Sequence, residues 1–390
     1  MARTPRRRRV PFAAALCLLV ATGLQTGCRA QETWPLWDAY ARRIIDGQGR
    51  VIDHTAQDRT TSEGEAYGLF FALVANDRTR FDKLLNWTEQ NLADGDLTQR
   101  LPAWSWGKRP DGSWGVTDQN PASDADLWMA YALSEAGRLW HTPRYQKLGT
   151  ALAARIAQQE VAFIPGLGTA LLPGTTGFHP DAETWLLNPS YLPPQLLAYF
   201  AKMMPTGPWA AILESLEPLL TRGSGSGYAM DWVAAGGSIR PSVTPTQVCS
   251  SDTAATPVGS YDAIRVYLWL GTADPQTPVV RQLLPRVLGM ANYMKQRLTP
   301  PERVDATGRV VNPAGPPGFS AALVPYLRAL NMGTQVKEQM ERLSESKDTS
   351  TGLYGKDAAY YDQNLSLFGT GWVEQRYRFD PNGRLQVKWK

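Results

Sequence analysis

The chain has 390 residues, of which 43% are hydrophobic and 10% aromatic, with 40 Lys and Arg against 36 Asp and Glu. Six arginines and none of the acids lie in residues 1–30, so residues 31–390 keep 34 basic and 36 acidic side chains, a net charge of about −2. This near-neutral charge gives no electrostatic reason to bind nucleic acid or anionic lipid. The three cysteines and three histidines show no CxxC or HExxH spacing, so we expect no disulfide framework, no metal site and no cofactor.

Residues 1–30 have the composition of a cleavable secretory signal. An arginine run precedes the apolar segment Val10–Leu24, whose 15 residues are fewer than the roughly 18 needed to span a bilayer. We therefore expect a periplasmic or secreted protein, residues 31–390, with no membrane span in the mature chain. Lipoprotein anchoring at Cys28 is the alternative, but Gln25 stands where that signal has an aliphatic residue.

Helical periodicity dominates the remaining chain. One set of expected helices carries glycines, aromatics and acids: 62–76, 123–140, 190–203, 260–271, 318–331 and 358–375. A second, amphipathic set has charged outer faces: 34–47, 79–91, 143–161, 207–222, 275–297 and 334–346. The two sets alternate, which predicts an all-α fold of six helical hairpins closed into an (α/α)6 barrel. An open helical solenoid is the alternative, but a closed ring explains better why the first set avoids charge.

Three segments depart from the helical pattern. Leu101–Asn120 is a long loop rich in polar and aromatic residues, and Ala234–Gly259 is rich in Gly, Pro, Ser and Thr. Tyr377–Trp389 alternates around a turn sequence, which predicts a β-hairpin. No linker interrupts the chain, so residues 31–390 are predicted to form a single domain with an open cleft and small β-hairpin or loop additions.

Three times, a serine and a carboxylate open an apolar helical run. The segments are Ser62–Tyr67, Ser123–Trp128 and Ser260–Arg265. Each serine can cap its helix, and each acid would then project from the helix mouth. Ordinary helix caps are the alternative for any single segment. Together with fourteen Trp and fifteen Tyr, whose flat rings suit the faces of sugars, the three segments favour glycoside chemistry.

Cleavage of a sugar bond by carboxyl groups requires one protonated acid and one ionised carboxylate. A helix N-terminus favours the anionic form of Glu63, so burial and a neighbouring carboxylate, expected to be Asp124, must raise its pKa. Asp262 precedes Arg265 by one helical turn, which can hold this carboxylate ionised; a structural salt bridge is the alternative. Glu65 occupies a capping-box position and is expected to be structural.

The spacing of Asp124 and Asp126 also fits a divalent-metal site, but the sequence has no second acidic cluster of the kind such sites use.

These segments resemble known motifs. Thr61–Gly68 resembles the T-S-E-G-Q-x-Y-G segment of family 8 glycoside hydrolases, and Ala122–Ala130 resembles the family's A-[ST]-D-[AG]-D-x-x-[IM]-A signature. Ser260–Arg265 is similar to its third acidic motif. The resemblance covers about Trp34–Arg378 and is greatest to the periplasmic endoglucanases associated with bacterial cellulose synthase.

The resemblance implies an (α/α)6 barrel and an inverting endo-β-1,4-glucanase. By position it implies Glu63 as general acid, Asp262 as general base and Asp124 as a further essential acid. Glu65 departs from the family, which has glutamine there. Residues expected to bind the substrate are Tyr67, Trp104, Trp106, Asp126, Trp128, Tyr191, Tyr261 and Arg265.

The expected partner is therefore a β-1,4-glucan (cellulose) chain, with a role in cellulose biosynthesis and export and a functional association with a cellulose synthase complex. Alternatives are the same fold acting on xylan, chitosan or mixed-linkage β-glucan, or a non-catalytic glucan-binding component of a secretion complex.

Overall fold

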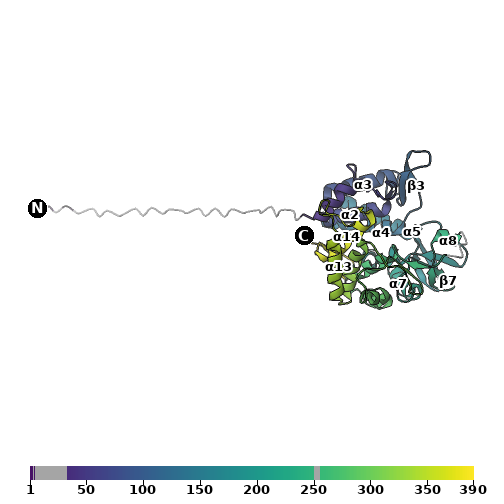
Figure 1. The fold of residues 1–390 in the computed structure, drawn as a ribbon. Coiled ribbons are helices and arrows are strands. Elements are labelled where there is room, and N and C mark those ends of the chain that lie inside the picture. The colour runs from purple at the N-terminus through teal and green to yellow at the C-terminus, as the bar shows by residue number, and fades with distance from the viewer. Residues whose placement is uncertain (3, 5–32, 250–254) are drawn as a thin grey trace. The chain divides into compact units, whose positions relative to one another are not determined.

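Buried helices form the centre of the protein, as a computed structural model of the chain shows (Figure 1). The structure describes residues 1, 2, 4, 33–249 and 255–390, and Thr33–Lys390 form one compact unit. Cys28 and nearly all of the segment 1–30 lie outside the described residues. The secretory signal and its lipoprotein alternative therefore stay predictions.

An inner set of helices is buried on nearly every face. Within the described residues its members are α2 (Ser62–Val74), α4 (Ser123–Leu139), α6 (Pro194–Met203), α9 (Ala263–Thr272), α12 (Pro317–Ala329) and α14 (Tyr360–Val373). In α4 every residue except Arg138 is buried. A helix that is buried all round must be covered on all sides, which places this set in the interior.

An outer set alternates with the inner one along the chain. Its members are α1 (Pro35–Ile44), α3 (Arg78–Leu92), α5 (Pro143–Gln159), α7 (Trp209–Gly223), the short segments α10 (Pro278–Leu283), η2 (Leu284–Val287) and α11 (Leu288–Met294), and α13 (Gly333–Ser346). These helices bury one face; in α13, for example, Gln339 and Leu343 are the buried residues. The two sets match the predicted alternation.

The inner helices close into a ring. Along the chain, α2 packs on α4, α4 on α6, α6 on α9, α9 on α12 and α12 on α14. The ring closes where Phe368 of α14 packs on Tyr67, Phe70 and Phe71 of α2, with ring centroids 4.7–5.4 Å apart. The predicted (α/α)6 barrel is therefore confirmed, and the open solenoid is excluded.

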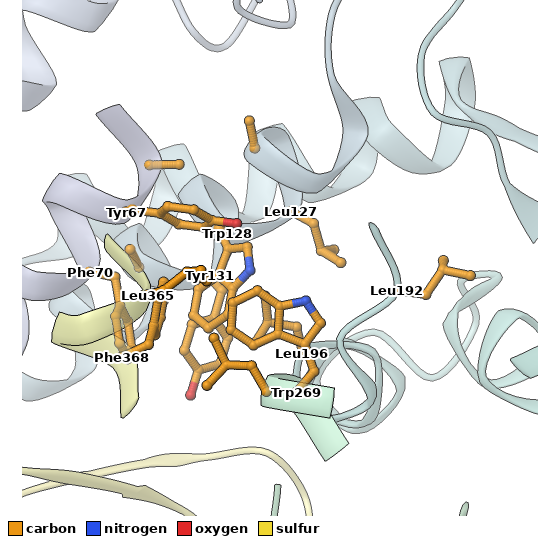
Figure 2. Close-up of a cluster of buried hydrophobic side chains, with 14 of the residues drawn as sticks. Tyr67, Phe70, Leu127, Trp128, Tyr131, Leu192, Leu196, Trp269, Leu365 and Phe368 are labelled. Atoms are coloured by element: carbon orange, nitrogen blue, oxygen red, sulfur yellow. The ribbon is translucent and has the colours of Figure 1, made fainter. Parts of the chain in front are cut away.

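Aromatic side chains fill the middle of this ring (Figure 2). Trp128 of α4 lies 4.9 Å from Phe70, 5.1 Å from Trp269 of α9 and 5.1 Å from Phe368, measured between ring centroids. Burying each such ring contributes roughly 1.5–3 kcal/mol to folding. The close-packed cluster gives the starts of α2, α4 and α9 a rigid support.

Proline changes two of the expected helices. The expected helix 275–297 is divided into α10, η2 and α11, because Pro285 has no N–H to donate to the preceding turn. The expected helix 190–203 begins late, at Pro194, after a separate 3-10 turn, Pro189–Tyr191. The sequence pattern shows the apolar face in both places but not the break.

Short antiparallel sheets connect the helices. The strands are β1 (Thr60–Thr61), β2 (Ser105–Lys108) and β3 (Trp114–Asp118); β4 (Val161–Ile164) and β5 (Gly168–Leu171); β6 (Thr184–Leu187), β7 (Trp232–Gly236) and β8 (Arg240–Ser242); β9 (Val258–Gly259), β10 (Arg303–Asp305) and β11 (Val310–Asn312); and β12 (Tyr377–Phe379) and β13 (Leu385–Val387). The strands have two to five residues, too few for a period-2 pattern to identify them.

The three non-helical segments differ in outcome. The C-terminal hairpin is confirmed, with Tyr377 paired to Val387. The expected loop Leu101–Asn120 instead contains the β2–β3 hairpin, and Ala234–Gly259 contains β8 and the short helix α8 (Pro245–Cys249). Each helix in the described part of the chain is too short or too polar to cross a lipid bilayer.

Candidate active site

The Arg265 guanidinium, one turn inside α9, binds carboxylates from three helix starts. Its Nη1 donates to Oε2 of Glu63, and its Nη2 lies 3.0 Å from Oδ1 of Asp262 and 3.5 Å from Oδ2 of Asp124. Nη2 also donates to Ser190 Oγ at 2.9 Å. Because only 4% of the Arg265 side chain is exposed, these charge-assisted bonds act where solvent screens them little.

The three predicted acids therefore share one cation. The Asp262–Arg265 pair follows from their spacing of one helical turn, whereas Glu63 and Arg265 are 202 positions apart and meet only through the closed barrel. Asp124 joins them from the start of α4. The predicted proximity of Asp124 to Glu63 is seen in this arrangement.

The main-chain N–H groups of the three serines bind neighbouring segments and so fix the three helix starts. The N–H of Ser62 donates to the Trp104 carbonyl at 2.9 Å, and that of Ser123 to the Pro173 carbonyl at 3.0 Å. The N–H of Ser260 donates to a carboxylate oxygen at 2.7 Å. The prediction that these serines cap their helices is wrong, because Thr61, Ala122 and Asp262 occupy the N-cap positions instead.

The cap of α2 is the preceding residue, Thr61, whose Oγ1 accepts from the N–H of Gly64 at 3.2 Å. Glu65 does not form the expected capping box either. Its Oε1 accepts from the N–H of Val51 at 2.7 Å, and burial raises its pKa well above the usual range. Glu65 is structural, as expected, and joins α2 to the segment before it.

Burial and charge compete at Glu63. Burial raises the pKa of this carboxyl, the Arg265 guanidinium lowers it, and the Asp262 carboxylate raises it again, with a net rise. A raised pKa is the direction that a general acid needs, since the group must hold a proton near neutral pH. The conflict expected from the helix N-terminus is thus decided by burial.

Asp124 is the most enclosed of the three acids. Burial raises its pKa to about 7, the Arg265 guanidinium opposes this, and the Glu63 carboxylate adds to it. Its Oδ1 accepts from the N–H of Ala125 at 2.8 Å. Its buried Oδ2 lies 3.5 Å from Nη2 of Arg265, so the guanidinium holds this oxygen in place.

Asp262 is the most accessible acid, with 30% of its side chain exposed. It precedes the first residue of α9, yet its carboxylate makes no capping bond to the described part of that helix and turns to Arg265 instead. An exposed, guanidinium-bound carboxylate can reach a water molecule. The arrangement thus places two more buried carboxyl groups beside a more open one.

Aromatic rings lie around this cluster. The Tyr191 ring is 5.7 Å from the Arg265 guanidinium carbon, and the Trp104 ring is 5.9 Å from that of Arg59. Tyr261 is 43% exposed beside Asp262. These positions agree with the predicted roles of Trp104, Tyr191 and Tyr261 as sugar contacts, which stay predictions.

The family model for glycosyl hydrolases family 8 matches residues 9–375. The chain belongs to this family. It is 44% identical to an endoglucanase of Xanthomonas axonopodis pv. citri, over 98% of this chain and 97% of that protein. It is 43% identical to an endoglucanase of Escherichia coli strain K12, over 96% of this chain and 95% of that protein. The protein is accordingly a glycoside hydrolase.

Solved structures agree with the barrel. The endo-1,4-D-glucanase of Vibrio fischeri ES114 superposes with a TM-score of 0.81 at 39% identity, covering 91% of this chain and 99% of that one. The endo-β-1,4-glucanase CMCax of Acetobacter xylinum gives 0.68 at 24% identity, covering 87% and 97%. The second likeness supports the family 8 fold alone.

Three predicted substrate contacts of this family 8 protein pack against other side chains. Trp128 is buried in the aromatic cluster among the inner helices (Figure 2). Trp106 packs on Trp87 of α3 and on Trp114, each 5.4 Å away between ring centroids. Asp126 is fully buried. We correct the assignment of the two buried residues, Trp128 and Asp126, from sugar contacts to supports of the site. Trp106 is half-buried, and its contact with the sugar stays a prediction.

Asp126 faces Glu160, the residue that follows α5. Burial raises the pKa of both carboxyls well above the usual range; Glu160 adds to the rise at Asp126, and Asp124 adds to the rise at both. Such burial favours the protonated, neutral form of both carboxyls. The pair adds little charge to the site above it.

Tyr67 lies between the core and the site. Its ring packs on Trp128 and Phe368, 6.0 and 5.0 Å away between centroids, and its pKa is raised by burial and then by Glu63. Among the described residues its buried hydroxyl has no hydrogen-bond partner. Tyr67 is 1% exposed, and its contact with a sugar stays a prediction.

Two residues at the site were missed from the sequence. Ser190 accepts from Arg265, and the Tyr361 hydroxyl donates to the Tyr261 carbonyl at 2.5 Å while its ring lies 5.9 Å from the Arg265 guanidinium carbon. Ser190 lies in a Pro-rich segment with Tyr191, a signal that could have found it. No such signal in the sequence marks Tyr361.

The carboxylates at the site are arranged around a guanidinium and not around a metal position. Among the described residues, no three His, Cys, Asp or Glu side chains are placed to hold a metal ion.

Proposed function

We propose that the protein is an endo-β-1,4-glucanase that hydrolyses a cellulose chain by a single-displacement, inverting mechanism. The observation that carries the proposal is the convergence of Glu63, Asp124 and Asp262 on Arg265. Relatives named endoglucanase, 43–44% identical over nearly their whole length, support the substrate class.

In this mechanism Glu63 donates its proton to the glycosidic oxygen as the bond from that oxygen to C1 breaks. A water attacks C1 from the opposite face, and Asp262 takes the proton that the water releases. Positive charge develops on the sugar ring between the two groups, and the Asp124 carboxyl lies beside it. Bond breaking, bond making and both proton transfers thus balance within one step.

Arg265 sets the charge of the three acids. The guanidinium favours the ionised form of whichever carboxyl it binds, while burial opposes ionisation most strongly at Glu63 and Asp124. The same cation supports a protonated donor and an ionised base because the two groups differ in burial.

We further propose that the enzyme works in the periplasm or outside the cell, after loss of residues 1–30, on glucan made by a cellulose synthase complex. The arginine-rich leader and the resemblance of the three acidic motifs support this proposal. Association with such a complex can be tested by co-purification from cells that make cellulose.

The experiment that tests the activity is release of reducing sugar from soluble carboxymethylcellulose, with Glu63→Gln as the matched control. We expect release by the native protein and a loss of at least about 10³-fold in the variant. Xylan, chitosan and mixed-linkage β-glucan are assayed in parallel. A higher kcat/KM on one of them would make that polymer the preferred substrate in place of cellulose. Binding without release on every polymer would instead indicate a glucan-binding component.

A further inference from the structure

Asp231 lies where two strands bring a second carboxylate to the start of α9. The residue precedes β7, and its own N–H donates to the Val258 carbonyl of β9 at 2.8 Å. Its Oδ1 accepts from the N–H of Ser260 at 2.7 Å and from the N–H of Ala263 at 2.8 Å. These two N–H groups flank Asp262 on either side.

The bonds of Asp231 replace those that Asp262 would otherwise make. An aspartate before a helix normally turns its carboxylate back onto the N–H groups of the first turn. Here the N–H of Ala263 is taken by Asp231, that of Ile264 by the Ser260 carbonyl and that of Arg265 by the Asp262 carbonyl, at 2.8, 3.0 and 3.0 Å. The N–H groups of the first turn of α9 therefore have hydrogen-bond partners without the Asp262 side chain.

The charges around Asp231 come from two helices. Asp262, Arg265 and Tyr267 face it from α9, and Tyr361 faces it from α14. Burial raises the pKa of Asp231 to about 7, and the Asp262 carboxylate adds to the rise. Near pH 6 the Asp231 carboxyl is therefore mostly neutral, and its Oδ1 serves as a hydrogen-bond acceptor more than as a charge.

We propose that Asp231 is a positioning residue for Asp262: it caps α9 from a neighbouring strand and thereby frees the Asp262 carboxylate for Arg265 and the attacking water. This inference rests on the proposed role of Asp262 as general base. It assigns to Asp231 no contact with the sugar. Loss of Asp231 should therefore change kcat and leave KM nearly as it was.

The test compares three substitutions at pH 6 on carboxymethylcellulose. Asp231→Asn keeps an Oδ1 acceptor and should retain kcat within about fivefold. Asp231→Ala leaves both N–H groups without this acceptor and should lower kcat by about 10²-fold with KM changed less than threefold. Asp231→Glu keeps the carboxyl group but moves its oxygens, so its kcat should fall below that of the Asn variant.

Asp380→Ala is the matched control, because Asp380 also accepts two backbone N–H groups, at 2.8 and 3.0 Å, in the turn of β12–β13. It should keep the native kcat. An Ala variant of Asp231 with kcat within threefold of native, or a Glu variant as active as the Asn variant, would overturn the proposal.

A crystal structure of Asp231→Ala tests the same point without any activity. We expect the Asp262 carboxylate to leave Arg265 and to accept from the first turn of α9. If Asp262 stays on Arg265 while a water binds the N–H of Ala263, Asp231 has no positioning role. This result is separate from the proposed function, which fails only if the native protein cleaves no β-glucan.

Discussion

Substitution of Asp124 by Asn should make the protein more stable at pH 8 while it impairs the enzyme. The pKa of Asp124 is raised from 3.8 to about 7 in the folded protein, chiefly by burial. A carboxyl whose pKa is higher in the folded than in the unfolded chain lowers the free energy of unfolding as the pH rises from about 4 to 7. The reason is that this carboxyl ionises at a lower pH in the unfolded chain. Below pH 4 both states are protonated, and the cost is absent.

The size of this effect follows from the shift. One pKa unit corresponds to about 1.4 kcal/mol, so ionising Asp124 in the folded state costs at most roughly 4 kcal/mol at pH 8. The Glu63 carboxyl raises the pKa of Asp124 and titrates together with it, which reduces the effect of Asp124 alone to about 2–4 kcal/mol. For a chain of this length that is a rise in Tm of about 3–5 °C.

The assay is thermal unfolding of the native protein and of Asp124→Asn, followed by tryptophan fluorescence at pH 4, 6 and 8. The variant should melt about 3–5 °C higher at pH 8 and at the native temperature at pH 4, where Asn imitates the protonated acid. A difference that does not change with pH, or a variant that melts lower at pH 8, would refute the account of the buried acid.

Two further substitutions test the assignment of roles. Asp262→Asn should lower kcat at least about 10³-fold while binding of the protein to insoluble cellulose, measured by pull-down, survives; equal loss of binding would make Asp262 structural. Asp126→Asn should change KM for carboxymethylcellulose less than about threefold, since the buried carboxyl is already neutral. A tenfold rise in KM would instead indicate that Asp126 contacts the sugar.

The barrel could be predicted because its two helix sets differ in a property that the sequence carries directly. Beyond its first turn α4 is mainly apolar, whereas α13 is apolar along one face, and a closed ring accommodates this alternation better than an open solenoid. The division of the segment 275–297 could not be predicted in the same way. Pro285 is compatible with the first turn of a helix, and the apolar periodicity continues across it.

The candidate site was predictable in its acids but not in its connections. The Asp262–Arg265 pair lies within one helical turn, a spacing visible in the sequence. The bonds that fix the helix starts cross between distant segments, as from Ser62 to Trp104, and no local pattern encodes them. The burial of Trp128 likewise depends on which face of α4 meets the other inner helices.

The most direct test of the central claim is proton NMR of cellopentaose immediately after addition of the enzyme. A single displacement across Glu63 and Asp262 inverts the cleaved β-linkage, so the α-anomer of the new reducing end should appear first and mutarotate to the equilibrium mixture. If the β-anomer appears first, the reaction proceeds with retention, and water does not attack as this account requires.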